Sequence, residues 1–435
     1  MMTLVAERQQ ALASAFEEFR RDKGFGPEWL AQARQTAFGR FLDRGFPTVR
    51  EEEWKFTNVA PVAQTAFTRP AAATPSKQAL APYLFDGLAT ILVVNGRVMA
   101  GLSTLASLPD GVKVRTLADV DPEKPAVRLR SEVTAIPSPF VDLNGAFFED
   151  LVTIRVAPKA IVTQPIHVVS IVMPGDRAAI VAPRLAVEVG EGAEVTLIET
   201  YATVGAGTAL TTAVTDITLG EGAVVHHTKI QRESAAVFHL ASTFVTLARS
   251  STFTSQAITF GGRIARNDIA AVLDGEGAEC TLNGLYLADG DALVDTHTVI
   301  DHAKPHCPSH EVYKGILGGR SRAVFNGKII VRQDAQKTDA KQTNKALLLT
   351  DDATINTKPQ LEIFADDVKC THGAAIGQLD DDAMFYLRAR GIAETDARSL
   401  LIHAFASDVL DGITVESVRE RVQQVMEDKL KIAHV

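Results

Sequence analysis

The segment LAVEVGEGAEVTLIETY, residues 185–201, places a glycine-rich turn between two runs in which apolar and polar residues alternate. The four residues of the turn, Gly-Glu-Gly-Ala, occur at positions 190–193, again at 220–223 and again at 275–278. Alternating β-branched runs bounded by glycine are typical of β-strands joined by tight turns. The copies begin 30 and then 55 residues apart, close to one and two periods of about 27 to 30 residues.

This irregular period favours a β-solenoid, in which the strands of each coil pair with those of the coils above and below. A β-sandwich would show turns every 8 to 12 residues or so, without a longer repeat, and a βαβ sheet would need helical segments between the strands. At about 25 residues per coil, we expect about nine coils. The ends of such a stack expose unpaired strand edges, and we expect the helical ends of the chain to cap them.

Four regions are expected along the chain. Residues 1–75 are predicted to be helical, because apolar residues recur at helical spacing, and residues 76–155 form a mixed connecting region. Residues 156–378 hold most of the strand-like runs and form the core of the solenoid. Residues 379–435 return to helical spacing.

The last predicted helix has an apolar stripe that begins with Val415, Val418 and Val422. Such a stripe either docks on the protein's own core or is offered to a partner protein. The spacing of the valines leaves both interpretations open.

The composition argues against several classes of function. The chain has 53 acidic and 44 basic residues and a formal charge of -9, which is unsuited to nucleic-acid binding. Three widely spaced cysteines do not suggest a disulfide framework, and no segment approaches the roughly 20 apolar residues of a membrane span. The N-terminal residues include charges where a signal peptide is apolar. We therefore expect a cytoplasmic protein that binds neither nucleic acid nor a membrane.

The sequence lacks the usual motifs of nucleotide binding, serine hydrolysis, zinc proteolysis and dithiol redox chemistry. A β-solenoid that acts on carbohydrates would need an export signal, which argues against that function here. Of the adjacent histidines His226 and His227, at most one can join any one site, because neighbours on a strand point to opposite faces. Cys280 lies inside a strand run and is expected to be a small buried apolar residue.

The densest group of potential ligands lies in DTHTVIDHAKPHCPSHEVYKG, residues 295–315. Its members are His297, His302, His306, Cys307 and His310. Imidazole and thiolate are ligands of zinc, iron and copper, so a metalloprotein that uses this group is an alternative function. The spacing matches no standard zinc motif, and the other possibility is a loop of exposed or hydrogen-bonded histidines.

A second candidate site lies in KCTHGAAIGQLDDD, residues 369–382. Cys370 and His372 are two positions apart, so on a strand their side chains share one face. They could be two metal ligands, or a buried cysteine beside a surface histidine. Zinc sites and iron–sulfur clusters take about four ligands, so this pair makes half of a site unless another subunit supplies the rest.

The stretch from YKGILGGRSRAVFNGKIIV to KCTHGAAIGQLDDDAMFYLRARGI, within residues 313–392, resembles the SufD branch of the SufB/SufD family. Members of this family belong to the Suf machinery for iron–sulfur cluster assembly. The resemblance implies a mainly β fold with a right-handed parallel β-helix core between helical regions. It also implies a non-catalytic scaffold subunit of an ATPase-driven assembly complex.

The same resemblance implies partners and a site. A SufB paralogue would form a heterodimer with this chain, and the SufC ATPase would bind its C-terminal helices. A nascent iron–sulfur cluster would be shared with SufB, with His372 as the expected ligand and Cys370 as a weaker candidate. SufB-like chains carry a sulfur-accepting cysteine in the segment that matches residues 346–353, and this chain has none there. The chain alone is thus expected to hold no tightly bound cofactor, and whether it forms a homodimer is left open.

Overall fold

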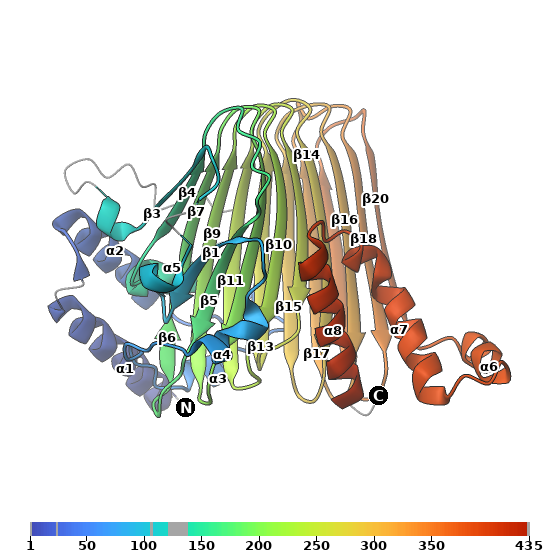
Figure 1. Cartoon of the computed structure of the whole chain (residues 1–435), viewed down its shortest axis with the longest axis horizontal. Coiled ribbons are helices and arrows are strands. Elements are labelled where there is room, and N and C mark those ends of the chain that lie inside the picture. The colour runs from blue at the N-terminus through green and yellow to red at the C-terminus, as the bar shows by residue number, and fades with distance from the viewer. Residues whose placement is uncertain (1, 23–24, 105–107, 121–137, 433–435) are drawn as a thin grey trace.

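The structure is a computed structural model that describes residues 2–22, 25–104, 108–120 and 138–432. Two long sheets face each other and run the length of the molecule (Figure 1). In spatial order, the first sheet contains β2 (Arg97–Val98), β1 (Ala89–Val94), β5 (Ile166–Val172), β8 (Glu194–Thr203), β10 (Val224–Arg232), β12 (Thr252–Thr259), β14 (Glu279–Ala288), β16 (Pro308–Leu317), β18 (Asp339–Leu348) and β20 (Lys369–Gly377). The second contains β19 (Thr354–Ile363), β17 (Arg322–Val331), β15 (Leu293–His302), β13 (Ile264–Leu273), β11 (Val237–Leu247), β9 (Ala209–Leu219), β7 (Arg184–Val189), β4 (Val152–Val156) and β3 (Val112–Arg115), with β6 (Ala179–Val181) paired to β9.

From β7 to β20, successive strands alternate between the two sheets, which confirms the β-solenoid. Within the first sheet, Glu194 pairs with Val224, Val224 with Thr252, and Thr252 with Glu279, always in parallel, so these three turns take 27 to 30 residues. The solenoid has about eight turns. The expected number of about nine was slightly high because it assumed a period of about 25 residues.

The Gly-Glu-Gly-Ala segments form the corners between the second sheet and the first. Their second glycines, Gly192, Gly222 and Gly277, have φ values of 60°, 64° and 70°, a conformation that strongly favours glycine. In the one corner between the second and third copies, Ser250 takes this position with φ 53°. This corner of different sequence explains why the third copy follows after two periods rather than one.

The first glycine of each copy is required by close packing between turns. A Cβ atom on Gly190, Gly220 or Gly275 would lie 2.5, 2.8 or 1.9 Å from a backbone nitrogen of the preceding turn. These positions therefore leave no room for a side chain. The repeated glycines allow successive corners to stack directly on one another.

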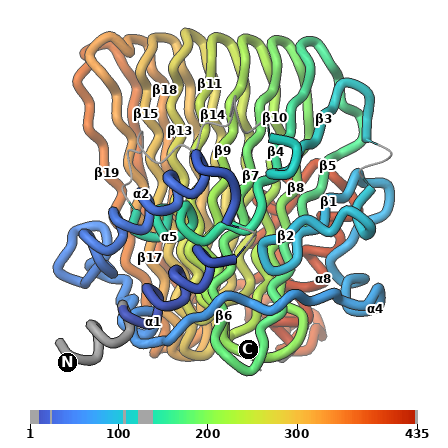
Figure 2. The backbone as a smooth tube through the Cα atoms, turned by 90° about the vertical axis from the view of Figure 1, so that its left-hand side faces the viewer, coloured from blue at the N-terminus to red at the C-terminus, as the bar shows by residue number. Residues whose placement is uncertain are grey.

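The N-terminal helices lie across the outer face of the second sheet, as Figure 2 shows for α1, α2 and α5. Helices α1 (Met2–Arg21), α2 (Glu28–Arg44) and α5 (Pro139–Phe147) share an apolar cluster with that sheet. Phe41 and Phe147, for example, belong to the same cluster as Phe238 of β11. The short helices α3 (Ala60–Ala63) and α4 (Lys77–Leu80) and the 3-10 turns Glu52–Trp54, Ala81–Tyr83, Ala100–Leu102 and Leu117–Asp119 complete this half of the chain.

The C-terminal helices α7 (Glu394–Leu410) and α8 (Glu416–Ile432) lie against the outer face of the first sheet (Figure 1). Val418 and Val422 are buried in one cluster with Ile258 of β12. The apolar stripe of the last helix thus docks on the protein's own core, and the interpretation that this stripe is offered to a partner is wrong. No helix in the described ranges is long and apolar enough to cross a membrane.

The two ends of the solenoid differ. At one end, β2 and β3 pair in antiparallel fashion with β1 and β4 and interrupt the parallel stacking. At the other end, no residue of β19 or β20 is fully buried. The helical regions cover the sheet faces instead of this end, so the expectation that they cap the stack is wrong here. The division of the chain into four regions stays a prediction, although β1 already joins the parallel sheet before residue 156.

Candidate functional site

Cys370 and His372 lie on β20, the strand at the open end of the first sheet. Their register partners on β18 are Ala340 and Gln342, and both of these are buried side chains that face the space between the sheets. Because register partners in a parallel sheet face the same way, Cys370 and His372 point toward the open end of that interior. The two side chains therefore share a face, as the alternation rule predicted.

The two candidates differ in accessibility. His372 is exposed, whereas Cys370 is half-buried and packs against the apolar cluster that includes Val331 and Ala335. Burial raises the pKa of the Cys370 thiol, which disfavours the thiolate that binds metals. The imidazole of His372 is thus the more available ligand of the pair.

The five potential ligands of residues 295–315 do not come together. His302 is buried between the sheets, where its Nε2 lies 2.9 Å from Ser309 Oγ and burial lowers its pKa to about 4. His306 is exposed in a corner turn, and His310 is half-buried on the next strand. Among the described residues, no group of three or more histidine, cysteine, aspartate or glutamate side chains is placed to hold a metal ion.

Cys307 occupies a structural position. It follows the positive-φ residue of its corner, as Ala223 and Ala278 do in theirs, and all three are fully buried. Its Sγ donates a hydrogen bond to the carbonyl oxygen of Gly275 at 3.3 Å. The position thus takes a small side chain inside the stack of corners, so the sequence signal for a metal ligand was misleading.

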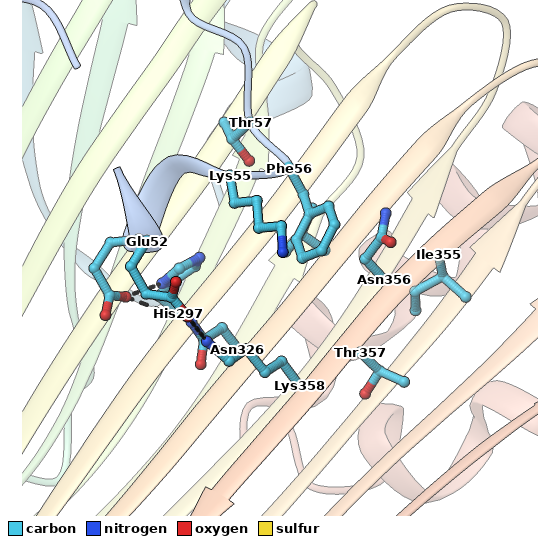
Figure 3. Close-up of a pocket in the computed structure, with 12 residues that line it drawn as sticks. Glu52, Lys55, Phe56, Thr57, His297, Asn326, Ile355, Asn356, Thr357 and Lys358 are labelled. Carbon is cyan, nitrogen blue, oxygen red and sulfur yellow. Dashed lines mark hydrogen bonds and ion pairs between the residues drawn. The ribbon is translucent and has the colours of Figure 1, made fainter. Parts of the chain in front are cut away.

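His297 lies on the same strand as His302, β15, but on the outer face of the second sheet. Its Nε2 is 3.1 Å from Asp295 Oδ1. Its Nδ1 is 3.2 Å from Glu53 Oε2 (Figure 3). Burial lowers the pKa of His297, but the two carboxylates outweigh this effect and the net shift is upward. The imidazole therefore joins the 3-10 turn Glu52–Trp54 to the sheet, a role that spacing alone could not indicate.

A pocket of about 430 Å³ opens beside His297. Lys55 and Phe56 from the N-terminal segment line one side, and Asn326 and Asn356 from β17 and β19 line the other (Figure 3). Lys358 forms an ion pair with Glu52 across its rim. These contacts fasten the N-terminal segment close to the open end of the second sheet.

Polar groups occupy part of the interior of the solenoid. Glu199 accepts a hydrogen bond from His227 at 2.9 Å, and the other ring nitrogen of His227 lies 2.9 Å from Ser255 Oγ. Burial alone would raise the pKa of Glu199, but His227, Lys229 and Tyr201 together outweigh burial and the pKa falls to about 2. His226 is half-buried on the opposite face of β10, as alternation predicts, and Cys280 is fully buried as expected.

Large apolar side chains are exposed around the open end and on the helices that follow it. Ile363 and Ile376 are 40% and 49% exposed on β19 and β20, and Phe364 beside them is 64% exposed. On α6 (Asp381–Ala389) and α7, Phe385 is 75% exposed and Leu400 is 51% exposed. Figure 1 shows α6 projecting away from both sheets. This part of the surface is suited to protein contacts.

Comparison with protein families agrees with this architecture. Residues 171–405 match a family model whose description is "SUF system FeS cluster assembly, SufBD core domain". The model of the SufBD protein N-terminal region matches residues 23–168. The chain belongs to the SufBD family of iron–sulfur cluster assembly proteins.

Relatives in the SufBD family align over most of the chain. A SufBD family protein of Synechocystis is 33% identical over 97% of this chain and 94% of its own length. The iron–sulfur cluster assembly protein SufD of Escherichia coli is 32% identical over 88% of this chain and 89% of its own length. The chloroplastic protein ABCI7 of Arabidopsis thaliana is 30% identical over 91% of this chain and 85% of its own length. This SufBD chain is thus a homologue of SufD.

Proposed function

We propose that the chain is a non-catalytic scaffold subunit that pairs with a SufB-type paralogue through the open end of its solenoid. The observation that supports this most is the exposure of β19 and β20, which end both sheets with no covering element among the described residues. Edge strands present unpaired backbone groups that a second chain with the same period can extend. Exposed Ile363, Phe364 and Ile376 would add apolar contacts at the same end.

In this proposal, His372 supplies one ligand to a nascent iron–sulfur cluster that is held between the two subunits. The cluster is the cargo of the assembly and is passed on, so the isolated chain is expected to hold no tightly bound cofactor. One accessible imidazole is too little for a cluster by itself, because clusters take about four ligands. That shortage is expected if the paralogue supplies the remaining ligands across the interface.

The role of His372 can be tested by reconstituting the complex from this chain, the SufB-type paralogue and the SufC-type ATPase. Thr371→Ala is a matched control, because Thr371 is the exposed neighbour on β20 and points to the other face. We expect His372→Ala to reduce the yield of assembled cluster at least several-fold and Thr371→Ala to leave it unchanged. Equal cluster yields from the wild type and both variants, with complex formation intact, would show that His372 is not a ligand of the cluster.

We further propose that α6 and α7 contact the ATPase. Phe385 and Leu400 are exposed on these helices, whereas the apolar face of α8 is already buried on the first sheet. Lys314 of β16 anchors α7 by donating to Phe405 O at 2.7 Å and pairing with Asp408. This anchor would couple movements of the bound ATPase to the sheet that ends at His372.

The open end would also allow two copies of this chain to pair when the paralogue is absent. Sedimentation of the isolated chain over a range of concentrations tests this possibility. A dimer that dissociates when the paralogue is added would show that both partners use the same end.

A further inference from the structure

Three polar residues are stacked in one inward-facing column of the first sheet at its open end. Glu311 of β16 pairs in register with Gln342 of β18, and Gln342 pairs in register with His372 of β20. Adjacent strands lie about 4.8 Å apart, so neighbouring side chains of a column are in contact distance. Glu311 and Gln342 are each only 1% exposed. The column thus leads from a buried carboxyl group to the imidazole at the rim.

The amide of Gln342 is held on two sides. Its Nε2 donates a hydrogen bond to Glu311 Oε2 at 2.6 Å. On the opposite sheet, Gly327 of β17 has no side chain, and the amide of Gln342 fills the space that a side chain there would need. A Cβ atom on Gly327 would lie 2.1 Å from Gln342 Nε2. The donor end of the amide therefore points toward Glu311, away from the open end.

The acceptor end of the same amide has no hydrogen-bond partner in the part of the chain that the structure describes. Gln342 Oε1 is buried and unpaired, although a buried carbonyl oxygen loses free energy without a donor. The next side chain in the column, on the side away from Glu311, is His372. A neutral imidazole has one ring N–H to donate and one lone pair left for a metal ion.

We propose that Gln342 is a positioning residue for His372. Its Oε1 accepts a hydrogen bond from one ring nitrogen of His372, which fixes the tautomer and the orientation of the imidazole. The other ring nitrogen then faces out of the open end with its lone pair available to cluster iron. Metal-binding histidines commonly use their second nitrogen in this way. The inference rests on the proposed function of His372 for its biological meaning, but the hydrogen bond itself can be tested without it.

The test uses the full isolated chain labelled with 15N in its histidine rings, at a pH above the usual titration range of histidine. The signals of His372 are assigned by their loss in His372→Ala. In the wild type we expect one tautomer and a ring N–H proton whose exchange with water is slowed. In Gln342→Leu we expect a mixture of tautomers and loss of that N–H signal. Asn344→Leu is the matched control, because Asn344 is another buried inward amide of β18 but pairs with Ala374.

A second measurement links the bond to cluster assembly. In the reconstituted complex, Gln342→Leu should weaken iron binding at the site roughly 10- to 100-fold, the usual effect of losing such a partner. Unchanged tautomer and N–H signals of His372 in Gln342→Leu, in a chain that melts like the wild type, would overturn the inference. If instead His372→Ala leaves the cluster yield unchanged while the signals respond to Gln342→Leu, the hydrogen bond stands and the proposed function fails.

Discussion

His306 occupies in its corner turn the position that Gly277 occupies in the corner before it. The two residues have φ values of 61° and 70°. The N–H of Gly277 donates to Pro305 O of the next corner, and the N–H of His306 donates in the same way to Gln336 O. His306, one of the potential metal ligands in the sequence, is therefore a turn residue in a conformation that favours glycine.

His306→Gly should leave the protein at least as stable as the wild type. Relief of the left-handed conformation should raise the free energy of unfolding by about 1–2 kcal/mol. The greater freedom of glycine in the unfolded chain should lower it by about 0.4–1 kcal/mol. His306→Val, with its branched side chain, should lose stability at the same position. Thermal melts of both variants check this, and a large destabilisation by His306→Gly would contradict it.

Gly275→Ala should destabilise the stack of corners strongly, by at least about 2 kcal/mol. The added Cβ would lie 1.9 Å from the backbone nitrogen of Arg249 in the turn below, where no flexible side chain can move aside. Gly175→Ala is the control, since a Cβ atom there meets nothing within 4 Å. Denaturant or thermal unfolding of the two variants should therefore separate them clearly.

The stability of Glu311→Gln relative to the wild type should increase as the pH rises. Burial raises the pKa of Glu311 to about 7, above the value of about 4.3 for an unfolded glutamate. The folded wild type therefore binds more protons than the unfolded chain between about pH 4 and 7, and its stability falls across that range. The melting temperature of the variant relative to the wild type should rise over this interval and then level off. Glu420→Gln, at an exposed position on α8, is the matched control.

His297→Gln should lower stability most in mildly acidic solution. The pKa of His297 is raised, so its stabilising effect is complete below about pH 6.5 and is lost as the pH rises through the folded-state value. The pKa of Asp295 is lowered to about 2, because His297 and Arg266 outweigh the effect of burial, so its contribution is present above about pH 4. The difference in melting temperature between His297→Gln and the wild type should peak between about pH 4 and 6.5.

Phe385→Asp should abolish or weaken binding of the SufC-type ATPase without unfolding the chain. The side chain is 75% exposed on α6, so its removal costs no core packing, while a buried aromatic contact in a complex is often worth at least tenfold in affinity. Glu427→Arg on the exposed face of α8 is the control. Wild-type affinity of Phe385→Asp in a binding titration would place the ATPase contact elsewhere.

The stacking period and the strand alternation were readable from local patterns. The repeated Gly-Glu-Gly-Ala segments predicted the corners, because the first glycine of each makes room for a neighbouring backbone and the second adopts positive φ. Alternation placed His226 and His227 on opposite faces and Cys370 and His372 on one face, as observed. These features depend only on residues close together in the chain, and such signals are present in the sequence itself.

The partners of each side chain across the fold were decided by tertiary structure. Residues 295–315 hold the densest group of potential ligands in the sequence, but His297 contacts Glu53 outside the solenoid while His302 is buried inside it. The register that puts Glu311, Gln342 and His372 in one column joins residues about 30 positions apart. That register, and the helices that cover the faces but leave one end open, arise from packing between distant segments. The sequence by itself determined a β-solenoid with helical ends, and tertiary packing decided which of its polar residues meet and where it can join a partner.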